Sequence, residues 1–185
     1  YWRAYHFIED AYALDEIKDP QDFYESAVAF GNFQRMLADF PADTLTETIA
    51  GFHDTKARFA AFEKVVEEDV CGRAAEVQKE IQFVKDRYDV ACVLGDLLEA
   101  GELPLRVTHN DTKSNNVLMD NATGKGLCVI DLDTVMPGLA VNDFGDSIRF
   151  GASTGTEDEK DLSKISCDME PVSYTHLRAH ETRRH

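Results

Sequence analysis

The sequence predicts an α+β fold that is mostly helical and carries one short β-hairpin. Apolar residues at three- and four-residue spacing indicate amphipathic helices in residues 20–40, 55–68 and 73–100. Two short apolar runs separated by the turn sequence NATGKG indicate the hairpin. Around the hairpin, residues 107–138 gather acids and amides between apolar runs. Buried polar groups need partners, so we look for a functional site there.

Length and charge limit the classes of function. The chain has 185 residues, enough for one domain with a sizeable core. Its net charge of −16 repels nucleic acid and anionic membranes, so we expect neither as a partner. No apolar run approaches the roughly 20 residues of a membrane span. We find no signal peptide and no C-x-x-C pair, which favours a cytoplasmic protein with reduced thiols.

The first elements follow from local composition. Residues 2–8 are rich in aromatic and β-branched types and predict a strand. Because this strand would begin at the first residues and no initiator Met precedes it, we expect the natural chain to start earlier. Asp19 is the expected N-cap of the first helix, Pro20 its first residue, and Pro41 its end.

Two further helices and a strand are expected before the hairpin. Residues 55–68 form the second helix, and residues 73–100 form the third, either continuous or broken at residues 89–92. Gly101 is a natural stop for that helix. The sequence LRVTH, residues 105–109, then predicts a strand.

The hairpin and one more helix complete the expected domain. VLMD, residues 117–120, and LCVIDL, residues 127–132, are its two strands. The sequence DFGDSIRF predicts the start of a helix with Asn142 or Asp143 as N-cap.

Residues 171–185 differ in kind from the rest of the chain. They are basic and His-rich in an otherwise acidic chain and lack an amphipathic period. The string closely resembles a translated sequencing adapter. We therefore expect a domain over residues 1–170 that ends near Glu170, and a non-native, disordered tail over residues 171–185.

The polar loop before the hairpin predicts phosphoryl transfer. Its spacing H-x-D-x-x-x-x-N begins at His109 and puts a carboxylate, Asp111, five residues before an amide, Asn116. Phosphoryl transfer to a hydroxyl needs a base and oxygen ligands for Mg²⁺. We predict Asp111 as the base, Asn116 and Asp131 as the metal ligands, and Lys113 as a contact of the transferred phosphoryl group.

Other polar residues nearby are assigned supporting roles. We interpret His109 as structural, and Asp133 as an acid that supports the metal ligands or binds a second metal. Residues 143–145 spell D-F-G but lie well past the hairpin, so Asp143 is interpreted as a helix cap or a brace for the loop. An alternative is that Asp111, Asp131 and Asp133 form a metallohydrolase cluster, which would need additional His ligands.

These motifs carry a family resemblance. HNDTKSNN, VIDLDTVMPG and NDFGDSIRFGAS resemble the aminoglycoside-phosphotransferase-like kinases, which share the protein-kinase fold. WRAYHFIED, TETIAGFHDT and LPLRVTHNDTKSNN narrow the resemblance to N-acetylhexosamine 1-kinases, over residues 2–170. The resemblance implies Mg²⁺- and ATP-dependent phosphorylation of the anomeric hydroxyl of N-acetylglucosamine or N-acetylgalactosamine.

The resemblance also implies further site residues. Tyr5, His6 and Phe7 match the hinge strand that lies against adenine. Phe150, and less closely Arg149, match positions that line the sugar pocket, although Phe150 could equally be a core aromatic at a helix end. The resemblance implies that Asp143 braces the catalytic loop.

Against the family, the chain lacks the glycine-rich phosphate loop and its lysine. We therefore expect the mostly helical C-lobe of a kinase-like fold with a remnant hinge strand and without the N-lobe, inactive as it stands. Two alternatives stay open. One is a kinase for another small hydroxyl compound, such as an aminoglycoside, choline or homoserine. The other is a non-catalytic, pseudokinase-like binding domain.

Overall fold

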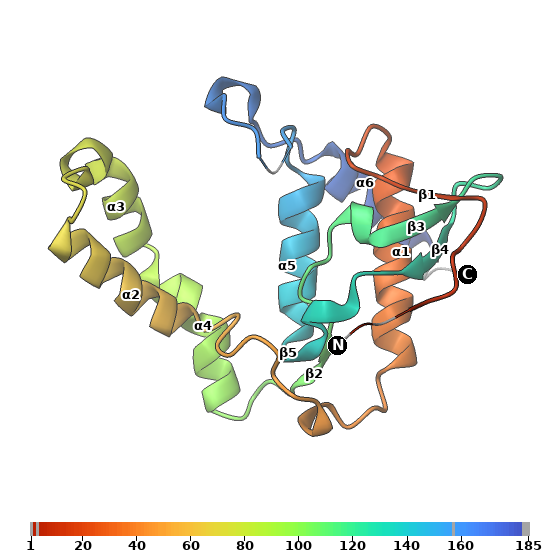
Figure 1. Cartoon of the computed structure of the whole chain (residues 1–185), viewed down its shortest axis with the longest axis horizontal. Helices are drawn as coiled ribbons and strands as arrows, with labels where there is room; N and C mark the ends of the chain where they lie inside the picture. The colour runs from red at the N-terminus through yellow and green to blue at the C-terminus, as the bar shows by residue number, and fades with distance from the viewer. Residues whose placement is uncertain (1, 3, 157, 183–185) are drawn as a thin grey trace. The chain divides into compact units, whose positions relative to one another are not determined.

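The chain forms two units. The computed structural model describes residue 2, residues 4–156 and residues 158–182. One unit comprises Tyr1–Thr48 and Arg106–His185, and the other comprises Ile49–Leu105. The first unit combines helices with small antiparallel sheets, and the second is built from helices (Figure 1). The predicted mixture of helix and strand is therefore confirmed.

Helix α1, Pro20–Met36, is the long helix of the first unit. It begins where the sequence predicts, and the Asp19 carboxylate accepts a hydrogen bond from the Gln21 amide at 2.8 Å. It ends four residues before the predicted end at residue 40, because the Leu37 amide already closes the last turn onto the Phe33 carbonyl.

The predicted hairpin is confirmed. Strand β3, Val117–Asp120, pairs antiparallel with β4, Gly126–Val129. The Asp120 carboxylate accepts hydrogen bonds from the amides of Ala122 and Thr123 at 3.0 and 2.7 Å and so shapes the turn. Strand β4 ends two residues before Asp131 rather than at it.

The strand predicted over residues 2–8 is wrong. The described residues of that segment are irregular, and the strand forms later, at β1, Ala11–Ala13. β1 joins the free edge of β3, so the sheet order is β1-β3-β4. Tyr5 and Phe7 are 74% and 89% exposed. Aromatic residues favour strands by packing on a half-buried pleated surface, and these side chains lack such a surface.

A second, two-stranded sheet carries the start of the polar loop. Strand β2, Arg106–Thr108, lies inside the predicted strand and pairs antiparallel with β5, Met136–Gly138. The sequence did not predict β5 because Pro137 is unusual in a strand away from an edge. A side chain at Gly138 would overlap the Thr108 hydroxyl, so the two strands approach too closely for any residue but glycine.

Two helices follow the strands. Helix α5, Ala140–Gly151, begins before the predicted cap, with Leu139 at its N-cap position. Helix α6, Glu170–Thr182, packs against α1. The structure thus has a helix at residues 170–182, where the sequence led us to expect a disordered tail. The Asp168 carboxylate accepts a hydrogen bond from the Glu170 amide at 2.9 Å, and Pro171 suits a first helical turn. Short 3₁₀ turns lie at Ala42–Thr44, Ser114–Asn116, Leu132–Thr134 and Leu162–Lys164.

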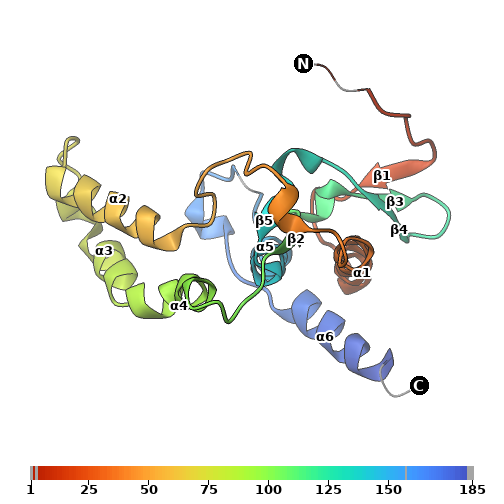
Figure 2. The ribbon, with the colours of Figure 1, turned by 90° about the horizontal axis from the view of Figure 1, so that it is seen from below.

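The core of the first unit lies between α1 and the strands (Figure 2). Phe30 of α1 packs on Val117 and Met119 of β3, which are fully buried. One turn later, Phe33 packs on Val107 of β2. The apolar face of α1 therefore supports both strands that flank the polar loop.

The second unit contains α2, Thr55–Glu68, with the predicted bounds. The predicted third helix is divided into a 3₁₀ turn at Ala74–Val77, α3 at Gln78–Lys85 and α4 at Tyr88–Glu99. The break between α3 and α4 falls at residues 86–87, earlier than the expected alternative at residues 89–92.

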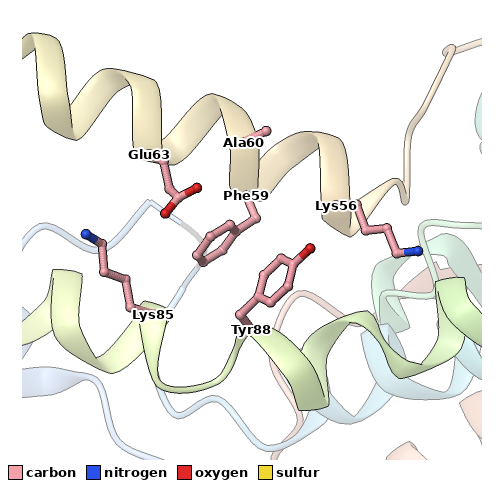
Figure 3. A pocket seen from close by; sticks show the side chains of 6 residues that line it. All are labelled: Lys56, Phe59, Ala60, Glu63, Lys85 and Tyr88. Carbon is pink, nitrogen blue, oxygen red and sulfur yellow. The ribbon is translucent and has the colours of Figure 1, made fainter.

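A cavity of about 500 Å³ lies between the helices of the second unit (Figure 3). The rings of Phe59 and Tyr88 lie next to each other in it, tilted by 53° and with centroids 4.4 Å apart. Lys56 at its edge pairs with Asp96 and Glu99 at 2.6 and 2.9 Å, and hydrogen bonds to these carboxylates raise the pKa of the lysine. No residue that the sequence predicts for the site lines this cavity.

Along the residues that the structure describes, every helix is too short or too polar to cross a membrane. All four cysteines are free thiols. Cys92 is buried and Cys128 half-buried, and burial raises the pKa of the Cys128 thiol.

Candidate active site

One buried carboxylate holds the start of the polar loop. Asp143 of α5 accepts hydrogen bonds from the backbone amides of His109 at 3.0 Å and Asn110 at 2.7 Å. Gln34 of α1 donates a third hydrogen bond to it at 2.9 Å. Asp143 is only 3% exposed. It does not cap α5, since it lies inside that helix, and its geometry is that of a brace for the loop.

His109 fixes the loop from within the core. Its ring is fully buried and meets Phe30 and Phe33 edge-on, with centroids 5.3 and 5.7 Å apart. Nε2 lies 2.9 Å from the Ile130 carbonyl, while the buried Nδ1 has no hydrogen-bond partner. A carbonyl only accepts, so Nε2 carries a proton and donates it. This arrangement suits a structural residue.

The loop after β4 is tied to the same segment. Asn110, in the left-handed region at φ 67°, donates from Nδ2 to the Thr134 carbonyl at 2.9 Å. The Thr134 hydroxyl donates to the His109 carbonyl at 2.7 Å. These reciprocal hydrogen bonds hold the two polar loops in a fixed register.

Asp111, Lys113 and Asn116 converge in the polar loop. The Asn116 amide nitrogen donates to the Asp111 carboxylate at 3.0 Å and to the Asp111 carbonyl at 2.9 Å. The Lys113 ammonium lies 3.3 Å from the same carboxylate oxygen, Oδ2. The Asp111 side chain is 26% exposed, so the carboxylate is held by two partners yet still open to solvent.

The residue before Asp131 is bonded to the polar loop. The Ile130 amide donates to the Asn116 carbonyl at 2.9 Å, and the Ile130 carbonyl accepts from His109. Asp131 itself has left-handed backbone angles, φ 58° and ψ 61°, and an exposed side chain. Asp133 is also exposed, and its backbone carbonyl accepts a hydrogen bond from Thr48 at 3.3 Å.

The donor set fits Mg²⁺. Both hydrogen bonds of the Asn116 amide leave from the nitrogen, which turns Oδ1 away from Asp111. With the exposed carboxylate of Asp131, this offers one neutral and one charged oxygen, the hard donors that Mg²⁺ takes besides phosphate oxygens and water. Within the described parts of the chain, no three His, Cys, Asp or Glu side chains gather as a metal site, so the metallohydrolase cluster finds no support.

The predicted adenine contacts are not gathered at this site. Tyr5, His6 and Phe7 are exposed and precede the first strand. The aromatic pattern of the segment was visible in the sequence, but the strand that would have ordered it is absent.

Arg149 and Phe150 line a cavity of about 570 Å³ in the first unit. Asn115, the neighbour of Asn116, lines it from the polar loop. The cavity wall is rich in carboxylates, which come from Asp15, Glu16, Asp158 and Asp168. The cavity therefore adjoins the loop that carries Asp111 and has an acidic lining.

Sequence reasoning missed three residues that hold the loop: Gln34, Thr112 and Asp146. The Thr112 hydroxyl donates to the Asp143 carbonyl at 2.6 Å, and its amide donates to the Asp146 carboxylate at 2.8 Å. Asp146 lies three residues after Asp143, on the same side of a helix, and this spacing was a readable signal. Gln34 gave none, because its partner is 109 residues away.

The polar loop thus carries a carboxylate, is held by Asp143 and is followed by a hairpin, the arrangement for which the sequence analysis predicted phosphoryl transfer. The model of the phosphotransferase enzyme family APH matches residues 1–166, and the chain belongs to this family.

Proposed function

We propose that the chain carries the base and metal half of an ATP-dependent small-molecule kinase. In the finer form of the proposal, the acceptor is the anomeric hydroxyl of N-acetylglucosamine or N-acetylgalactosamine and the product is the sugar 1-phosphate. Family membership supports phosphoryl transfer. The narrower choice of acceptor rests on the sequence resemblance described above. A protein-kinase-like arrangement of the whole catalytic domain belongs to the same proposal.

The observation that carries the proposal is the fixed position of the Asp111 carboxylate. Asn116 and Lys113 hold one of its oxygens at 3.0 and 3.3 Å, and Asp143 ties down the backbone immediately before it. A base for phosphoryl transfer must be oriented but reachable, and Asp111 is both.

The residues divide the chemistry between them. The acceptor hydroxyl oxygen forms a bond to the γ-phosphorus while the bond to the β,γ-bridging oxygen breaks and ADP leaves. Asp111 accepts the hydroxyl proton. Lys113 places a positive charge beside the carboxylate, where the phosphoryl group arrives. Asn116 and Asp131 would hold Mg²⁺, which supplies electrostatic stabilisation of the phosphates when bound.

The acidic cavity favours a second candidate. Its carboxylates would attract a cationic acceptor, so an aminoglycoside is the alternative substrate class. The dependence of turnover on ionic strength distinguishes a neutral N-acetylated sugar from a polycationic aminoglycoside as the acceptor. Turnover of the cation should fall steeply as ionic strength rises, whereas turnover of the neutral sugar should not.

The test uses the full-length gene product and ³¹P NMR. With Mg-ATP and N-acetylglucosamine we expect a sugar 1-phosphate signal, and Asp111→Asn should reduce kcat by at least about a thousand-fold because the proton acceptor is lost. Mg-ATP binding by Asp111→Asn should stay within about two-fold of the wild type. Surviving turnover in Asp111→Asn would remove Asp111 as the base. Nucleotide binding without turnover of any acceptor by the wild type would favour the non-catalytic alternative.

A further inference from the structure

Asp146 contacts two parts of the site with its two carboxylate oxygens. Oδ2 accepts a hydrogen bond from the Thr112 amide at 2.8 Å. Oδ1 accepts from Arg149, with Nε at 3.0 Å and Nη2 at 2.9 Å. The Asp146 side chain is 18% exposed, so solvent competes only partly for these bonds. One carboxylate thus joins the polar loop to a residue that lines the acidic cavity.

The first contact completes a clamp around Asp111. Asp143 accepts from the amide before it, at Asn110, and Asp146 accepts from the amide after it, at Thr112. Asp143 and Asp146 lie three residues apart on α5, so one helix face supplies both acceptors. The backbone of Asp111 is held on both sides by the same rigid element.

The second contact orients Arg149 in the cavity. Its guanidinium is 57% exposed, and both of its contacts with Asp146 run to a single oxygen. The cavity holds other carboxylates that would attract a guanidinium with no fixed partner. An acceptor that contacts Arg149 would therefore also act on the carboxylate that holds Thr112.

We propose that Asp146 is a positioning residue that couples the acceptor cavity to the base, through Arg149 on one side and Thr112 on the other. The expected changes in kcat and KM rest on the proposed function. The hydrogen-bond link itself stands on the geometry alone.

The kinetic test compares Asp146→Asn, Arg149→Gln and the double variant of the full-length gene product, with N-acetylglucosamine and kanamycin as acceptors. Asp146→Asn should lower kcat roughly ten-fold, the effect of one charge-assisted hydrogen bond, and raise the acceptor KM while the Mg-ATP KM stays constant. Arg149→Gln should raise the acceptor KM and lower kcat by a smaller factor, about three-fold, because Thr112 keeps its acceptor on Asp146. The double variant should resemble Asp146→Asn, because the two changes remove one shared link.

A matched control is Asp96→Asn. Asp96 lies on a helix and pairs with Lys56, but it lines neither the cavity that contains Arg149 nor the polar loop. Its kinetic constants should stay within about two-fold of the wild type. Unchanged kcat in folded Asp146→Asn, or effects of the two single variants that multiply in the double variant, would overturn the coupling.

A second measurement separates this inference from the proposed function. Hydrogen exchange at the Thr112 amide should be at least about ten-fold faster in Asp146→Asn, and faster by a smaller factor in Arg149→Gln, with exchange in α1 unchanged. If the wild type phosphorylates no acceptor, the proposed function fails while this measurement still decides the link. Unchanged exchange at Thr112 in Asp146→Asn would overturn the link itself.

Discussion

At the residue scale, the Asp143 carboxylate makes several of the hydrogen bonds that hold the polar loop. It accepts hydrogen bonds from two buried backbone amides and from a partly buried side-chain amide of α1. We expect Asp143→Ala to lower the free energy of unfolding by about 2–4 kcal/mol, since two buried N–H groups lose their acceptor. Gln34→Ala removes only one of the three donors and should cost about 1 kcal/mol. Urea denaturation of both variants checks the order, and equal losses would contradict the central role of Asp143.

Gly138 gives a second residue-scale prediction. A methyl group there would overlap the Thr108 hydroxyl, so Gly138→Ala should destabilise the protein by about 1–3 kcal/mol through overpacking. Gly145→Ala is the control, because nothing lies within 4 Å of its added methyl group and it sits inside α5. That change should stabilise by up to about 1 kcal/mol through helix propensity. Thermal melts measure both effects, and Tm values that shift in the same direction for the two variants would contradict this prediction.

At the residue scale, prediction from sequence depended on spacing. The interval between Asp111 and Asn116 put both residues on one tight loop, and the structure joins them by a hydrogen bond of 3.0 Å. The interval of three residues from Asp143 to Asp146 carries similar information, since it puts both carboxylates on one side of a helix. Gln34 was out of reach, because a hydrogen bond across 109 residues leaves no local pattern.

At the element scale, capping and turn chemistry predicted well and strand propensity did not. Asp19 with Pro20 gave the start of α1, and the Asn- and Gly-containing turn gave the hairpin. The strand over residues 2–8 failed because a strand needs an edge to join, and the edge of β3 is taken by β1. Strand propensity indicates that a segment suits a sheet, but it does not show whether a free sheet edge lies near that segment.

Helix α6 supplies the element-scale prediction. The Tyr174 hydroxyl donates to the Gln21 side chain of α1 at 2.8 Å, and the two helices pack together. We expect Tyr174→Phe to lower the free energy of unfolding by about 1 kcal/mol. Deletion of residues 170–185 should lower it further, because all packing of α6 on α1 is lost as well. If the deletion left the free energy of unfolding unchanged, residues 171–185 would not fold with the domain, as the sequence led us to expect.

At the scale of the whole molecule, the predicted base and metal site falls within one of the two units. Every residue of the predicted base and metal site belongs to the unit formed by Tyr1–Thr48 and Arg106–His185. The helices of Ile49–Leu105 contribute none. The sequence showed these helices but could not show the division, which depends on contacts between segments far apart in the chain.

Ligand linkage then predicts where stabilisation appears. A ligand that binds only the folded state stabilises it by about 2.7 kcal/mol at a hundred times its Kd. With Mg-ATP, the full-length gene product should show a higher Tm and slower hydrogen exchange in residues 109–116 and 130–134, with no change in residues 55–99. Chelation of Mg²⁺ should remove most of this effect, and Asp131→Asn should remove the part that depends on Mg²⁺ while leaving the apo protein as stable as the wild type. Asp133→Asn tests the specificity of that assignment, because it neutralises an equally exposed acid two residues away. If Asp133→Asn abolished the Mg²⁺ dependence and Asp131→Asn did not, the charged metal ligand would be Asp133.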